Sequence, residues 1–116
     1  MLNKWAIEHI QLIKDTANFV WGTQCRFGEV QVIDSPYSEF NLPMRLYGLY
    51  DIQLEYERST LGIMVKNDLG YTTLSQLSTQ QVFRGLESMK PANLLHNFRV
   101  LDQFIRGNEF SEQKVN

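Results

Sequence analysis

Cysteine is nearly absent from this chain of 116 residues, because Cys25 is the only one. A single thiol cannot form an intramolecular disulfide, which favours a reducing compartment. Long apolar runs are also absent, and segments such as 63–65 fall far short of the roughly 20 residues that a membrane-spanning helix needs. The N-terminus has no charged-then-apolar pattern typical of a secretory signal. We therefore expect a soluble, cytoplasmic protein that does not bind a membrane.

The chain has no excess of basic charge. Lys and Arg together number 11, and Asp and Glu number 13, which gives a net charge of −2. Residues 1–60 carry five basic and eight acidic side chains, so the acidity is concentrated in the first half. Because nucleic-acid-binding domains present many cations to phosphate, we expect no direct binding of nucleic acid.

Signatures of catalysis and of cofactor binding are missing as well. Neither the Gly-x-Ser-x-Gly motif of a nucleophile elbow nor a Gly-x-x-x-x-Gly-Lys phosphate loop occurs. The two histidines, His9 and His96, have no partner at a metal-ligand spacing. Cys25 adjoins Arg26, whose charge is expected to lower the pKa of the thiol. We predict no cofactor, no metal and no catalytic activity; a small enzyme using His9 or His96 with Cys25 or a carboxylate remains the third hypothesis.

The composition is that of one ordinary globular domain. Hydrophobic residues make up 43% and charged residues 21% of the chain, and the length is near the commonest domain size. We place a single globular domain at residues 1–107. The polar residues 108–116 are expected to form a flexible C-terminal tail.

The first half of the chain predicts a helix followed by strands. Apolar residues recur every three or four positions from Trp5 to Val20, which indicates a helix that ends at Gly22. Strands are predicted over 26–33, 45–57 and 61–66, with a surface loop over 34–43 and a hairpin turn at 57–60.

From residue 72 onward the spacing of apolar residues becomes helical. A short helical turn is expected at 73–77, and Ser78 with Gln81 fits a capping box before a helix that extends to Met89. Pro91 suits the first turn of a last helix, which Gly107 ends. The fold class is therefore α+β: an N-terminal helix, a three-stranded, mainly antiparallel sheet, and two or three C-terminal helices packed on one sheet face.

The candidate site is the acidic face of the strand predicted at 45–57. Apolar side chains occupy its even positions, whereas acidic and amide side chains occupy odd ones. Alternate side chains on a strand are about 6.6 Å apart, so these carboxylates create a local negative field. The face is either a solvated outer surface or a docking surface for a basic partner. Its members are Asp51, Gln53, Glu55, Glu57 and Tyr47, and Asp34, Tyr37 and Glu39 of the preceding loop extend it.

The whole chain resembles the small, single-domain immunity proteins of bacterial contact-dependent inhibition and related toxin systems. The likeness lies in the length, the mild acidity, the many aromatic residues and the stretch from 46–52 through 57–62. The resemblance implies binding to a cognate toxin domain with a basic surface, often a nuclease, and blocking of its active site. The alternative is a small homo-oligomeric structural or adaptor domain, in which the long strand or an aromatic face pairs with a second copy.

Overall fold

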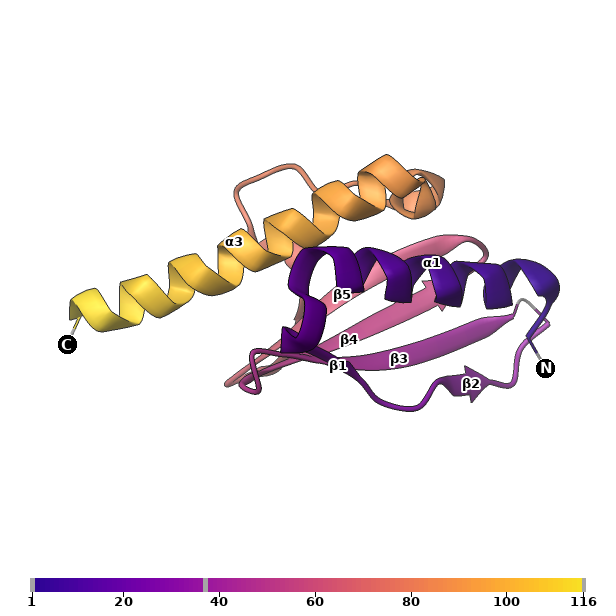
Figure 1. Cartoon of the computed structure of the whole chain (residues 1–116), viewed down its shortest axis with the longest axis horizontal. Helices are drawn as coiled ribbons and strands as arrows, with labels where there is room; N and C mark the ends of the chain where they lie inside the picture. The colour runs from indigo at the N-terminus through magenta and orange to yellow at the C-terminus, as the bar shows by residue number, and fades with distance from the viewer. Residues whose placement is uncertain (1, 37, 116) are drawn as a thin grey trace.

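The computed structural model describes residues 2–36 and 38–115, with side chains as far as residue 107. It has the expected α+β architecture, with an N-terminal helix, an antiparallel sheet and a long C-terminal helix (Figure 1). The elements in chain order are α1 (Lys4–Trp21), η1 (Gly22–Gln24), β1 (Cys25–Phe27), β2 (Gln31–Ile33), β3 (Glu39–Leu46), β4 (Tyr50–Glu57), β5 (Thr60–Asn67), β6 (Gly70–Thr73), α2 (Leu74–Leu77), η2 (Gly85–Met89) and α3 (Pro91–Val115).

The sheet has the strand order β1-β3-β4-β5-β6, and β2 also pairs with β3. Every pairing is antiparallel. The register aligns buried side chains in rows across three strands, because Leu42 lies opposite Leu54, which lies opposite Ile63. A second such row is Phe40, Tyr56 and Leu61.

Both long helices cover the face that these rows form, and Figure 1 shows α1 lying along the strands with α3 beside it. Asn3 caps α1 by accepting a hydrogen bond from the Ala6 backbone N–H at 2.9 Å. Ala6 and Ile13 are fully buried. The other sheet face carries half-buried and exposed side chains along its length. The result is a two-layer domain with one covered and one open sheet face, and we call the latter the outer face.

The predicted three-stranded sheet is wrong in its strand number, because the described residues form a sheet of six strands. Residues 39–43, expected in a loop, form the first part of β3, which is a central strand. The two prolines that bracket this segment, Pro36 and Pro43, concealed the alternation of its buried side chains. Pro43 has no N–H to donate within β3. Its carbonyl still takes part in strand pairing, because it accepts a hydrogen bond from the Gly28 N–H at 2.9 Å.

The strand predicted at 45–57 is interrupted by a tight turn. Tyr47 and Gly48 have φ values of +56° and +68°, and Leu49 N–H donates to the Leu46 carbonyl at 3.0 Å. This is a primed β-turn, which joins β3 to β4. Three residues separate the paired Leu46 and Tyr50, so even-numbered side chains lie on the same sheet face before and after the turn. The apolar–polar alternation of the sequence therefore continues through the turn and gives no sign that the chain reverses direction.

The strand predicted at 26–33 is in fact two short strands on the same edge of β3. β1 and β2 pair with opposite ends of β3, and the chain between them leaves the ladder at Gly28. A Cβ at Gly28 would lie only 3.2 Å from the Pro43 Cβ, so a larger residue there would need Pro43 to shift by a few tenths of an ångström.

The helix predicted to extend to Met89 is also wrong. Residues 78–84 contain no helix, and only the short η2 follows. We call residues 78–89 the strap. The Asn97 side chain holds it to α3 by accepting from the Phe83 N–H at 2.9 Å and donating to the Phe83 carbonyl at 3.0 Å. These bonds keep Phe83 extended, and Gly85 then adopts a φ of +63°, outside the helical region.

α3 begins at Pro91 as predicted, but it does not end at Gly107 and instead continues to Val115. The predicted flexibility of 108–116 stays a prediction, because Asn116 and the side chains of 108–115 lie outside the described residues. Within the described ranges, no helix combines the length and the apolar character needed to cross a membrane.

The β4–β5 hairpin generates a stability prediction. Arg58 and Ser59 form its two-residue turn with φ values of +49° and +61°, a conformation that costs non-glycine residues about 1–2 kcal/mol each. We expect Ser59→Gly to raise the free energy of unfolding by about 1 kcal/mol, as measured by urea denaturation. Ser59→Ala is the matched control and should give no gain, since alanine keeps the strain. An equal gain from both variants would contradict the backbone explanation.

Candidate functional site

The outer face divides into a basic end and an acidic end. At the end near the β3–β4 turn, Arg26 lies opposite Arg45, which lies opposite Asp51. Lys66 lies on the same face opposite Tyr71. Arg45 Nε is 3.4 Å from Asp51 Oδ1, and both side chains are substantially exposed. This end, which we call the basic end (Arg26, Arg45 and Lys66), therefore surrounds the Asp51 carboxylate with cations.

The acidic end lies toward the β4–β5 turn. Glu55 is exposed and opposite Asn41, and Glu57 is exposed and opposite Thr60. Continuing the register by one residue places Glu39 beside Glu57. We call Glu39, Glu55 and Glu57 the acidic end. Glu57 Oε1 lies 3.9 Å from Arg58 Nε, a pair exposed on both sides and therefore weak.

The candidate site residues are thus only partly grouped. Glu55, Glu57 and Glu39 share one end of the outer face, and Glu39 accepts a hydrogen bond from the Ser35 hydroxyl at 2.8 Å. Gln53 lies between the two ends, opposite Pro43, whereas Asp51 belongs to the other end. Asp34 is exposed directly after β2, and Tyr37 lies outside the described residues.

Tyr47 does not lie on the outer face, contrary to the sequence interpretation. It sits in the β3–β4 turn, where its hydroxyl donates to Asp102 Oδ1 at 2.5 Å and accepts from Arg106 at 3.0 Å. The Trp21 indole N–H donates to the same Asp102 oxygen at 2.9 Å. Burial, and next the hydrogen bond to Asp102, raise the pKa of Tyr47. These bonds join α1, the turn and α3, so the network has a structural role.

Cys25 also differs from expectation. It is half-buried at the start of β1, and burial raises the pKa of its thiol to about 11. The exposed Arg26 therefore does not activate it. A thiol with so high a pKa is almost entirely protonated at neutral pH, which makes it a poor nucleophile.

Each of the two histidines contacts a residue that holds the fold together, and the two do not pair with each other. His9 Nδ1 is 2.7 Å from the Tyr56 hydroxyl, and burial lowers the pKa of His9. His96 Nε2 donates to the Gln81 carbonyl at 2.8 Å, and its ring meets the Phe83 ring edge-on. His9 thus braces α1 against the covered sheet face, while His96 helps to hold the strap.

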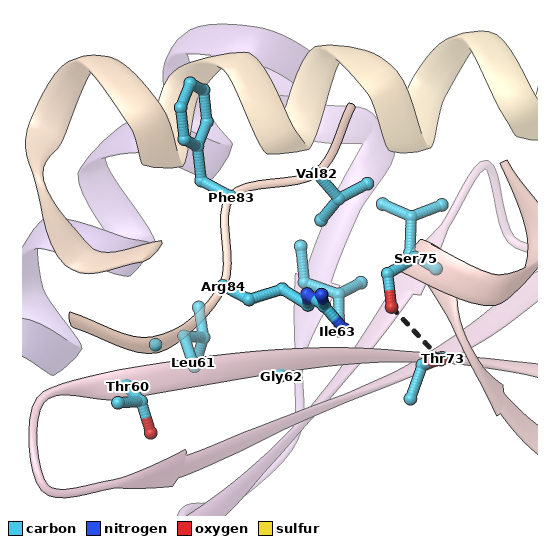
Figure 2. A pocket seen from close by; sticks show the side chains of 11 residues that line it. Thr60, Leu61, Gly62, Ile63, Thr73, Ser75, Val82, Phe83 and Arg84 are labelled. Atoms are coloured by element: carbon cyan, nitrogen blue, oxygen red, sulfur yellow. Dashed lines mark hydrogen bonds between the residues drawn. The ribbon is translucent and has the colours of Figure 1, made fainter. Parts of the chain in front are cut away.

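A cavity of about 230 Å³ opens between β5 and the strap. Its floor and walls come from three segments: β5, the junction of β6 with α2, and the strap (Figure 2). Figure 2 shows the Arg84 side chain extending from the strap over Ile63 toward Ser75. The lining residues are Thr60, Leu61, Gly62, Ile63, Thr73, Leu74, Ser75, Val82, Phe83, Arg84 and Gly85.

Sequence reasoning missed this cavity because it interpreted the strap as a helix. An apolar stripe of Val82, Phe83, Leu86 and Met89 suggested a buried helical face, yet Leu86 is 69% exposed. Two features could have indicated that this segment is not a regular helix: Gly85 within it, and the polar residues Ser88 and Asn97, which are buried. Buried polar side chains need hydrogen-bond partners, which the irregular backbone of the strap supplies.

No family model matches the chain, and neither a curated protein nor a solved structure matches it significantly. No group of three or more His, Cys, Asp or Glu side chains able to hold a metal ion occurs within the described part of the chain.

The raised pKa of Cys25 is directly measurable. A shift from 9.0 to about 11 reduces the thiolate fraction at pH 8 roughly 100-fold. We expect iodoacetamide to alkylate the folded protein about 100-fold more slowly than it alkylates the urea-unfolded chain. Mass spectrometry of timed samples measures both rates. Alkylation as fast as in the unfolded chain would contradict the burial of this thiol.

Proposed function

We propose that this chain is a non-enzymatic binding protein whose outer face docks onto a protein partner with a basic surface. In its most concrete form the proposal is an immunity protein that neutralises a toxin domain by covering the active site. The observation that carries it is the acidic end, where Glu39, Glu55 and Glu57 share one end of the uncovered outer face.

The architecture supports this use of the outer face. Both long helices pack on the other side of the sheet, so no described helix competes for this surface. Glu55 and Glu57 are alternate residues of β4, so their side chains project on the same side about 6.6 Å apart. The sheet fixes the backbone positions of these glutamates. Binding of a partner with matching cations therefore has to order only side chains and no loop, which keeps the entropic cost of binding low.

The basic end gives the outer face a direction. A basic partner is attracted to Glu39, Glu55 and Glu57 and repelled by Arg26, Arg45 and Lys66, so the charge pattern selects one orientation. Charge complementarity of this kind raises association rates and specificity more than affinity. For a nuclease partner, the carboxylates of the acidic end would occupy the positions of substrate phosphates.

The decisive experiment reverses the acidic end. We expect Glu39→Lys/Glu55→Lys/Glu57→Lys to lower the association rate with the protein encoded by the neighbouring gene at least 10-fold at low salt. The loss should shrink as salt rises, because ions screen exposed charges over about 8 Å at physiological strength. Stopped-flow or surface plasmon resonance measurements at several salt concentrations provide the rates.

The matched control makes the same charge change elsewhere. Glu8, Asp15 and Asp68 are exposed on α1 and in the β5–β6 turn, so replacing all three by Lys should cost much less. Asp51→Lys should also have a small effect, because Asp51 already pairs with Arg45 at 3.4 Å. Equal losses in both triple variants would remove the acidic end from the proposal.

A second candidate is a homo-oligomeric structural domain, which the exposed aromatic residues of α1 favour. Trp5 is 67% exposed and Phe19 is 71% exposed, with the half-buried Leu12 midway between them. A spacing of seven residues returns to nearly the same side of a helix. The three side chains therefore form an apolar stripe beside the buried face of α1, suited to the same stripe of a second copy.

Light scattering separates the two candidates. If the stripe pairs with a second copy, the protein is a dimer at micromolar concentration and Trp5→Glu/Phe19→Glu converts it to a monomer. Ile7→Glu is the control, because Ile7 is 57% exposed but two positions from Trp5, on nearly the opposite side of the helix. A wild-type protein that stays monomeric at every concentration excludes the homo-oligomer.

A further inference from the structure

We propose that the cavity between β5 and the strap binds the C-terminal end of an extended peptide from a partner protein, with Arg84 holding the terminal carboxylate. This site is separate from the acidic end, and the inference does not rest on the function proposed above. Its basis is the backbone geometry of the two walls, the length of the opening and the charge inside it.

The first wall is a stretch of strand edge that no neighbouring strand covers. β6 ends at Thr73, which pairs with Met64, so β5 from Thr60 to Ile63 has no strand on that side. Backbone groups in an antiparallel ladder point alternately to the two sides. The two-residue hairpin directs those of Thr60 and Gly62 toward β4. Those of Leu61 and Ile63 therefore point toward the cavity edge.

One of these edge groups is already occupied. The Leu61 N–H donates to the Ser88 hydroxyl at 2.8 Å, and that hydroxyl donates to the Gly85 carbonyl at 2.6 Å. On the side of η2, the Ser88 hydroxyl thus accepts the Leu61 N–H that a neighbouring strand would otherwise bind. The Ile63 N–H, midway along the cavity, remains in position to donate to an added chain.

The second wall is the extended part of the strap. Asn97, which is 1% exposed, bonds both backbone groups of Phe83 and so directs them toward α3. Arg84 has extended dihedral angles of φ −120° and ψ 170°. The peptide bond that directs the Phe83 carbonyl toward Asn97 directs the Arg84 N–H the opposite way, away from α3. The Arg84 carbonyl begins η2 as its N-cap. The N–H groups of Ile63 and Arg84 thus supply one backbone donor from each wall.

The opening is too short for a peptide that passes through. From Leu61 to Ile63 the strand advances two residues, about 7 Å. Ser75 of α2 bounds one end and Gly85 of η2 bounds the other. The volume of about 230 Å³ is below the usual 300–1,000 Å³ of small-molecule sites. A chain terminus of one or two residues fits these limits.

The charge inside the cavity selects a carboxyl terminus over an amino terminus. Arg84 is exposed, and no Asp or Glu within the described residues forms an ion pair with it. A guanidinium binds a carboxylate through two parallel hydrogen bonds. The Ser75 hydroxyl donates to the Thr73 hydroxyl at 3.3 Å, which leaves the Thr73 hydroxyl as a further donor (Figure 2). Val82 is half-buried and offers apolar contact to a final residue such as valine, whereas the Phe83 ring lies against α3 (Figure 2).

The test measures fluorescence polarisation with a library of fluorescein-labelled hexapeptides that end in Ala, Val or Leu with a free carboxylate. We expect a subset to bind, and amidation of the terminus to weaken that binding roughly 10- to 100-fold, the range of a lost charge-assisted hydrogen bond. Arg84→Gln should weaken binding of the free-carboxylate peptides to the same degree. N-acetylvaline alone should compete only weakly, because it forms few of the backbone bonds to β5.

A further variant guards against indirect effects. Arg99→Gln removes an exposed arginine from α3 outside the cavity, and it should leave the affinity unchanged. Absence of binding across the library, or binding that survives both amidation and Arg84→Gln, would overturn the proposal.

Discussion

The rest of the structure depends on the burial of one sheet face under two helices. Rows such as Leu42, Leu54 and Ile63 present continuous apolar surface across three strands, and α1 and α3 remove that surface from water. At roughly 25 cal/mol per Å² of apolar surface, burial of this kind is the main favourable term in a domain of this size. Because the side-chain period of a strand is two, the same burial places every odd position of β4 on the outer face, where each is half-buried or exposed. The charged outer face is therefore a direct consequence of the core.

A second constraint comes from two buried polar side chains. Asn97 and Ser88 are the described polar residues with the least exposure, at 1% and 0%. Each satisfies backbone groups that irregular structure would otherwise leave unpaired: Asn97 those of Phe83, and Ser88 those of Leu61 and Gly85. Leaving such groups unpaired costs about 1–3 kcal/mol each. The strap is therefore fixed at two points, to α3 through Asn97 and to the start of β5 through Ser88, and the cavity lies between the strap and β5 beside these attachments.

Sequence reasoning succeeded where local periodicity and packing agree. The α1 stripe, the even face of β4 and the hairpin after Glu57 were all predicted, because burial there follows a regular period. It failed where tertiary contacts decide the backbone. The turn at Tyr47 preserves the alternation and so leaves no break in the pattern, while the extended state of Phe83 depends on Asn97, fourteen residues away. The acidic end was half predicted for the same reason. Glu55 and Glu57 share a strand with Asp51, but Arg45 opposite Asp51 comes from β3, and Arg26 opposite Arg45 comes from β1.

The Asp102 carboxylate links parts of the chain that are far apart in sequence. It accepts from Trp21, 81 residues away, and from Tyr47, 55 residues away. Bringing such distant segments together requires closing long loops, whose entropic cost delays contacts of this kind during folding. The hairpins between β3 and β6, by contrast, join neighbours in sequence and can form early. Docking of α3 at this carboxylate is therefore suited to be a late step in folding, the one that locks the first and last helices together.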